Sequence, residues 1–234
     1  ALTLENENAF GRAVQAMTRR SIACSAAHHF VACYPMVGIA DILAGLYGTE
    51  KLLLGMVEQP QGVQRAMEHL TRLWLEEFDR VCTLIEAAGN PGHMTWMAIW
   101  APGRACATQE DFSYMISDAM FRQFCLLPLE TLVDSLDYAM YHLDGAGALS
   151  HLDTLLGIKK LRAIQWVPGA GRERVAPWYE VIRRVLEGGK SVEVFARPEE
   201  VADLVKEVGA RGLLIHCGEV SEEQAQWLLE EWPQ

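Results

Sequence analysis

Two side chains that can bind a metal or move a proton, His142 and Asp144, stand two residues apart in MYHLDGAGALSHLDTLLG, residues 140–157. The apolar residues before them indicate a buried strand, and the pattern after them indicates a helix. Residues two apart on a strand face the same side of the sheet. The pair could therefore hold a metal, bind a substrate carboxylate or transfer a proton. Alternatively, His142 is a hydrogen-bonded core residue and Asp144 caps the following helix.

Gly145 and Gly147 follow this pair and indicate a tight turn into the start of a helix. Backbone N–H groups at such a start can bind an anionic group of a substrate. A plain tight turn would need the same glycines, so both interpretations stay open.

Other side chains that can bind ligands or metals recur where further strands are expected to end. In parallel α/β folds the loops at these ends carry the chemistry. The candidates are His28, His29, Trp100, Arg104, Asp111, Gln165, Trp166, His216 and Cys217.

Each of these candidates also has a structural explanation. Arg104 could clamp a carboxylate or phosphate with two hydrogen bonds, or could be a solvated loop residue. Trp100 and Trp166 could stack on a flat ligand or belong to the core. Asp111 could act as an acid–base group or orient its loop. Surface or structural roles are favoured for His28 and His29.

A closed sheet would bring Cys217, on the last expected strand, across to His142 and Asp144. These three residues could then form a metal site with an open position. The alternative, that Cys217 is a small buried apolar residue, is favoured. His216 is an alternative donor, because adjacent strand residues face opposite ways and the sequence does not set the register.

The elements that would position these residues alternate strictly in the second half of the chain. Strands are predicted near residues 22–31, 94–100, 138–143, 162–166, 191–195 and 212–216. Helices are predicted between the later strands, over residues 5–20, and through the long region before residue 89. Pro60 is expected to open one helix, Ser117 to cap another, and Pro128 to kink or split the latter. This order predicts a parallel sheet covered by helices.

Composition limits the classes of function. The 234 residues are half hydrophobic and carry a net charge of −11, which argues against a nucleic-acid partner. No apolar run is long enough to cross a bilayer, so no membrane partner is expected. Six cysteines without CxxC spacing indicate reduced thiols and a cytoplasmic protein.

Several stretches resemble the uroporphyrinogen decarboxylase (URO-D) superfamily. They are QEDFSYMIS, FRQFCLLPLE, YHLDGAGALSHLDTLLGIKKLRAIQWVPGAG, KSVEVFARPEEV and RGLLIHCG, with a weaker likeness at GIADILAGLYGTEKLLLGMVEQPQGVQRAMEHL. The resemblance implies a TIM-barrel fold. It also implies either a cofactor-free decarboxylase or a zinc-dependent methyltransferase that works with corrinoid proteins, methyl-thiols or folates.

The chain departs from the methyltransferase pattern at the metal site that the resemblance implies. There the family holds zinc with His-x-Cys-Gly and a later Cys. Here the motif reads His142-Leu143-Asp144-Gly145, and Cys217 stands near the position of the later thiolate. A His/Asp/Cys set would bind zinc more weakly than a thiolate site.

The expected fold is a single α/β domain over residues 1–234, a TIM-barrel-like (β/α)8 fold with about six strand–helix units. Compared with the URO-D superfamily that it resembles, the chain is expected to lack the N-terminal part of the barrel. The protein would then form a homodimer or pair with the missing segment.

The function expected first is a metal-assisted methyltransferase that acts on a small molecule or on a corrinoid-bound methyl group. His142, Asp144 and Asp111 would be catalytic, and His142, Asp144 and Cys217 would bind zinc. The substrate would lie against Arg104, Trp100, Gln165, Trp166, Gly145 and Gly147. One alternative is a URO-D-type decarboxylase, which needs positive clamps, and this acidic chain has few of them at its strand ends. The other is a non-catalytic partial barrel that pairs with another chain.

Overall fold

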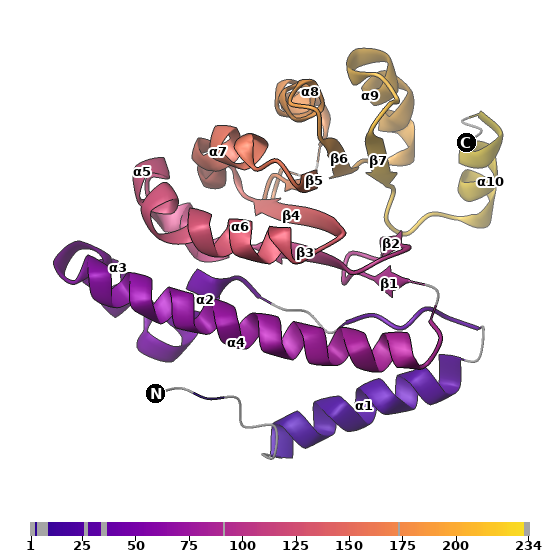
Figure 1. The fold of residues 1–234 in the computed structure, drawn as a ribbon. Helices are drawn as coiled ribbons and strands as arrows, with labels where there is room; N and C mark the ends of the chain where they lie inside the picture. Colours follow the sequence, from indigo (N-terminus) through magenta and orange to yellow (C-terminus); the bar gives the residue numbers. More distant parts are fainter. Residues whose placement is uncertain are drawn as a thin grey trace. The chain divides into compact units, whose positions relative to one another are not determined.

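The structure, a computed structural model, describes residues 3, 9–25, 28–33, 37–90, 92–172 and 174–231. A five-stranded sheet has the order β3-β4-β5-β6-β7 and is flanked by helices, so the predicted α/β class is confirmed (Figure 1). The chain divides into two compact units, Ala1–Met140 and Tyr141–Gln234, which are described separately. Among the described residues, no helix has the length and apolar character that crossing a bilayer requires.

The first unit is mainly helical. Its helices are α1 (Ala9–Ser25), α2 (Ile39–Tyr47), α3 (Thr49–Glu58), α4 (Pro60–Ala87), the 3₁₀ helix η1 (Asp111–Met115), α5 (Asp118–Met120), the π-helical η2 (Phe121–Cys125) and α6 (Leu126–Asp134). Its strands are β1 (His93–Met94), β2 (Trp100–Ala101) and β3 (Ala105–Gln109). The strand β4 (Tyr138–Asp144) begins in this unit and ends in the second.

Helix α4 provides much of the core of the first unit. Pro60 is its first residue, as predicted, because proline needs no N–H partner there and its φ suits a helix. Apolar side chains recur every three or four residues on one buried face. They include Met67, Leu70, Trp74, Phe78, Val81 and Ile85.

The predicted strand at 22–31 is wrong, since residues up to Ser25 continue α1. The run IACS follows the helical pattern with no glycine or proline to interrupt it, and Ala and Cys permit a helix. His28 and His29 therefore lie in a turn after a helix, where the Ser25 carbonyl accepts from the His28 N–H. They are not at the end of a strand.

The predicted strand at 94–100 is also wrong. β1 and β2 pair antiparallel, with His93 opposite Ala101, and a turn separates them. The strand β3, with the sequence ACATQ, follows this hairpin and was not among the predicted strands. Its small residues carry little β propensity, and burial along most of its length removes the alternation that would have marked it.

The helix predicted after Ser117 is present and runs from α5 through η2 to α6. The Ser117 Oγ caps it by accepting from the Met120 N–H at 3.3 Å. A π-helical stretch then runs directly before α6, which contains Pro128. Pro128 cannot donate to the Phe124 carbonyl and would clash with it, so the wider π turn relieves the conflict.

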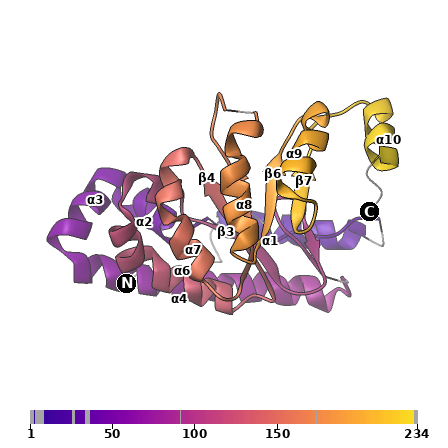
Figure 2. The same cartoon turned by 90° about the horizontal axis from the view of Figure 1, so that it is seen from above.

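The second unit has the predicted alternation of strands and helices. Its elements after β4 are η3 (Ala146–His151), α7 (Leu152–Gly157), β5 (Leu161–Val167), η4 (Ala176–Trp178), α8 (Tyr179–Glu187), β6 (Ser191–Phe195), η5 (Pro198–Glu200), α9 (Val201–Val208), β7 (Leu213–His216) and α10 (Glu222–Glu231). β5 pairs parallel with β6, and β6 with β7. Helices α7, α8 and α9 lie along one side of these strands (Figures 1 and 2).

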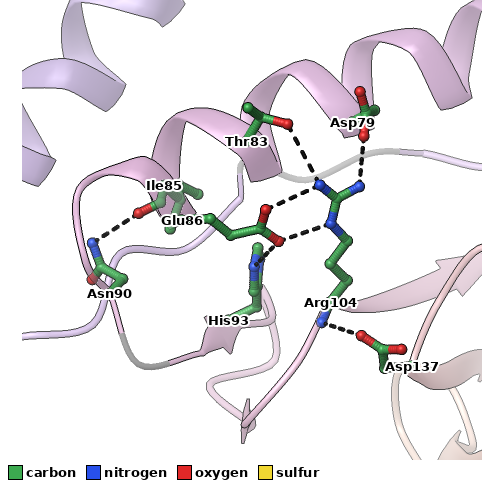
Figure 3. Close-up of polar contacts among 8 residues, drawn as sticks. All are labelled: Asp79, Thr83, Ile85, Glu86, Asn90, His93, Arg104 and Asp137. Atoms are coloured by element: carbon green, nitrogen blue, oxygen red, sulfur yellow. Dashed lines mark hydrogen bonds and ion pairs between the residues drawn. The ribbon is translucent and has the colours of Figure 1, made fainter.

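Arg104 holds the segment before β3 against α4 in the first unit. Its guanidinium donates to both carboxylate oxygens of Glu86, at 2.8 and 3.0 Å, and to Asp79 Oδ1 at 2.6 Å (Figure 3). Its backbone N–H donates to Asp137, and Glu86 also contacts buried His93. The hydrogen bond from Arg104 lowers the pKa of Glu86, while burial lowers the pKa of His93. The geometry therefore favours a charged Arg104–Glu86 pair beside a neutral imidazole.

We expect Arg104→Met to lower the free energy of unfolding by about 1–2 kcal/mol, because it removes a two-pronged ion pair that water only partly screens. Arg122→Met is the control, since Arg122 pairs with Asp118 on an exposed helix face. The control should cost about 0.5 kcal/mol or less. Urea unfolding at low and high salt measures both. Equal losses in the two variants would contradict this role for Arg104.

Candidate functional site

A row of polar side chains crosses the sheet of the second unit. His142 on β4 meets Gln165 on β5, with 2.5 Å between His142 Nδ1 and Gln165 Oε1. Gln165 Nε2 donates to Glu193 Oε2 on β6 at 3.0 Å. Gln165 and Glu193 are also direct neighbours in the strand register. Three adjacent strands therefore place these groups in one continuous hydrogen-bonded chain.

The inner end of this row is buried. Gln165 is 3% exposed and Glu193 2% exposed, whereas His142 is partly exposed. Burial raises the pKa of Glu193, and the hydrogen bond from Gln165 offsets part of that rise. Among the described residues, no cation forms an ion pair with Glu193, so the hydrogen bond from Gln165 is the contact that stabilises its carboxylate. The row thus runs from a buried acid to an imidazole that solvent can reach.

A second layer lies at the ends of β4, β6 and β7, where Asp144 and Phe195 come two residues after His142 and Glu193. Asp144, Phe195 and His216 end β4, β6 and β7. Phe195 and His216 are register partners and stack with ring centroids 4.9 Å apart. Phe195 is 43% exposed, and both Asp144 and His216 are exposed. Because residues two apart share a face, this open layer stands over the polar row and could contact a bound molecule.

The predicted pair His142 and Asp144 lies on one strand, β4, as expected. The structure joins His142 to Gln165, which was predicted to bind substrate, and leaves Asp144 exposed. Gly145 has φ 79°, a conformation that favours glycine, and its N–H donates to the Val167 carbonyl at 2.8 Å. That N–H is engaged within the protein, which disfavours the predicted anion site there. Gly147 is exposed in η3.

The predicted zinc ligands do not assemble in the part of the chain that the structure describes. No three His, Cys, Asp or Glu side chains among these residues lie close enough to hold one metal ion. Cys217 follows the last residue of β7, and burial raises the pKa of its thiol, which disfavours the thiolate that zinc binds. The described residues therefore give no support for the predicted zinc site, and we assign no chemical step to a metal.

Trp166 does not serve the predicted ligand-stacking role. It is adjacent to Gln165 on β5 and therefore faces the opposite side of the sheet. It is 2% exposed and packs edge-on against Trp178 at 5.2 Å. This is the helix-covered side of the strands, so Trp166 is a core residue.

Three further candidates lie in the first unit. Trp100 packs against Phe30, with ring centroids 5.6 Å apart. Arg104 donates to the carboxylates of α4 rather than presenting its guanidinium to a ligand. Asp111 accepts from the Gln109 side chain at 2.9 Å and lies in η1, which agrees with the loop-orienting alternative.

Glu193 and Phe195, both within SVEVFA, were not among the site residues predicted from the sequence. A signal was present for Glu193. Strands of a parallel sheet are buried on both faces, so a carboxylate between two valines must face a polar partner inside the protein. Phe195 carried no such signal, because an aromatic residue at a strand end is ordinary in a core.

A buried acid in the first unit, Glu110, directly follows β3 and was also not predicted from the sequence. Its carboxylate accepts from the backbone N–H groups of Ile39 and Ala40 at 3.0 and 2.8 Å, at the start of α2. Asp41 in turn accepts from the Asp111 and Phe112 N–H groups at the start of η1. Burial, with the Asp41 charge nearby, raises the pKa of Glu110 to about 8. Two helix starts are thus capped by each other's acids.

Comparison of the chain with models of protein families, with curated proteins and with solved structures found no match.

The raised pKa of Glu110 predicts a pH-dependent stability. In the unfolded state Glu110 loses its proton near its ordinary pKa of 4.5, whereas in the folded state it keeps the proton up to about pH 8. Stability should therefore fall as pH rises through this range, with a slope from this group of at most about 1.4 kcal/mol per pH unit.

Glu110→Gln should remove that slope, and urea unfolding at a series of pH values measures it. Glu130→Gln, at an exposed position of α6, is the control and should keep the wild-type slope. A Glu110→Gln variant whose stability falls with pH as steeply as the wild type would show that Glu110 does not hold this proton.

Proposed function

We propose that the chain is an enzyme of the URO-D type that transfers a methyl group, with His142 as the base that takes a proton from the methyl acceptor. The observation that supports this most is the partly exposed imidazole of His142, connected through Gln165 to a buried carboxylate. Buried acids that orient an imidazole are typical of catalytic sites. The resemblance at YHLDGAGALSHLDTLLG supplies the reaction class.

In this proposal the acceptor is a thiol or another weakly acidic X–H group that lies at the open layer. His142 takes the proton of X–H as X forms a bond to the methyl carbon. The bond from the methyl group to its donor breaks, and its electron pair leaves with the donor. Phe195 and His216 would contact the flat or apolar part of a bound molecule.

The proposal also specifies the type of barrel and the methyl donor. The parallel strands β3 to β7 would belong to a (β/α)8 barrel of the URO-D type, with His142 at its carboxyl-terminal mouth. The methyl donor would be a corrinoid protein or a folate, brought to that mouth. A zinc ion in the acceptor site is part of the class that the resemblance implies, and elemental analysis of protein purified without chelator tests it.

The direct experiment measures demethylation of methylcobalamin in the presence of a small thiol. We expect His142→Ala to lower turnover about 10²- to 10⁴-fold, because a positioned base contributes that much. His69→Ala, on α4 in the first unit, is the control and should keep wild-type turnover.

Two arms give the outcomes that would overturn the proposal. Release of carbon dioxide from uroporphyrinogen without methyl transfer would show a decarboxylase. Methyl transfer that His142→Ala leaves unchanged, in a variant with wild-type circular dichroism, would remove His142 from the reaction.

The exposed strand β7 favours pairing with a second copy of the protein. It is the last strand in the order of the sheet, and Leu214 is 47% exposed. Edge strands without charged side chains pair readily with other strands. We expect light scattering to give the mass of a dimer, and Leu214→Lys to shift it towards a monomer, whereas Leu229→Lys on exposed α10 should not. A monomeric wild type would contradict this.

A further inference from the structure

The row of His142, Gln165 and Glu193 has an amide, that of Gln165, between its two titratable groups. Its middle member is an amide, which is a donor at one end and an acceptor at the other. An amide between two groups therefore couples their hydrogen-bonding states. When the NH₂ group of the amide faces one neighbour, its carbonyl oxygen faces the other.

In this row, a carboxylate oxygen of Glu193 accepts a hydrogen bond from Gln165. Gln165 must therefore turn its NH₂ group towards Glu193, as the 3.0 Å contact from Gln165 Nε2 to Glu193 Oε2 shows. The carbonyl oxygen of Gln165 then faces His142 Nδ1. An oxygen facing that nitrogen can only accept, so Nδ1 must carry the hydrogen.

A neutral imidazole carries one hydrogen, so the Nδ1–H form leaves the basic lone pair on Nε2. Free imidazole side chains do not have this arrangement imposed on them. The order of the strands makes it possible here, because β5 lies between β4 and β6 and places Gln165 between the two groups.

We propose that Glu193 is a positioning residue that acts through Gln165 to hold His142 as the Nδ1–H tautomer, with Nε2 as the nitrogen that accepts a proton. This inference builds on the site of the proposed function and assigns the base to one atom. It needs no particular methyl donor. It also explains why a carboxylate is kept in the middle of an apolar strand, where burial disfavours its charge.

The test is nuclear magnetic resonance of the full chain labelled with ¹⁵N at histidine, at a pH where the imidazole of His142 is neutral. His142→Ala identifies the signals of that ring. We expect the wild type to show a protonated, pyrrole-type Nδ1 and an unprotonated, pyridine-type Nε2. An Nε2–H ring in the wild type would overturn the inference.

Glu193→Gln is the central variant, because it keeps the shape and removes the charge. A glutamine at 193 can donate as well as accept, so the Gln165 amide is free to turn over. We expect a large loss of the Nδ1–H form. Glu187→Gln, the same change at an exposed position in α8, should leave the ring as in the wild type. An unchanged ring in folded Glu193→Gln would overturn the proposal.

Gln165→Met provides the second line of evidence and stands even where Glu193→Gln fails to fold. Methionine makes neither hydrogen bond of the amide, so His142 should no longer be held in the Nδ1–H form. In the Gln165→Met background, Glu193→Gln should have no further effect on the ring, because the two changes act through one path. A Gln165→Met ring that stays Nδ1–H would contradict the role of the amide.

The tautomer and the reaction can fail separately. If the variants lose the Nδ1–H form but the wild type transfers no methyl group, the role of Glu193 and Gln165 stands and the proposed function is wrong. Where methyl transfer is found, Glu193→Gln should lower kcat roughly 10- to 100-fold with little change in KM, as for other groups that orient a reactive imidazole.

Discussion

The buried carboxylate of Glu193 is the constraint on which the candidate site depends. An acid placed between Val192 and Val194 in an inner strand loses its hydration, and the described residues offer it no ion pair. Hydrogen bonding from the neighbouring strand then becomes the available compensation. Gln165 provides it, and in doing so turns its carbonyl towards His142. The site thus follows from a requirement of the core.

The same sheet explains which residues are at hand for chemistry and which are not. Alternation along β5 sends Gln165 to the polar row and Trp166 to the side covered by helices. Parallel registers put Phe195 beside His216, where both remain accessible at the strand ends. Cys217 lies beyond the last strand, so it is outside this alternation.

Much of the second unit could be predicted from the sequence, because its strands are short apolar runs separated by clear helices and turns. The strand at 191–195 was predicted at its observed bounds. The first unit was harder to predict. IACS and ACATQ both contain several small residues that suit either a helix or a strand, and packing decides between them. The partners of Arg104 were also beyond sequence reasoning, since Asp79 and Glu86 lie well before it in the chain.

The measurement that tests this account most directly is neutron diffraction from deuterated crystals of the protein. We expect deuterium on Nδ1 of His142 and the ND₂ group of Gln165 directed at an unprotonated Glu193. Deuterium on Nε2 with a bare Nδ1, or side chains of His142 and Gln165 that do not meet, would contradict it.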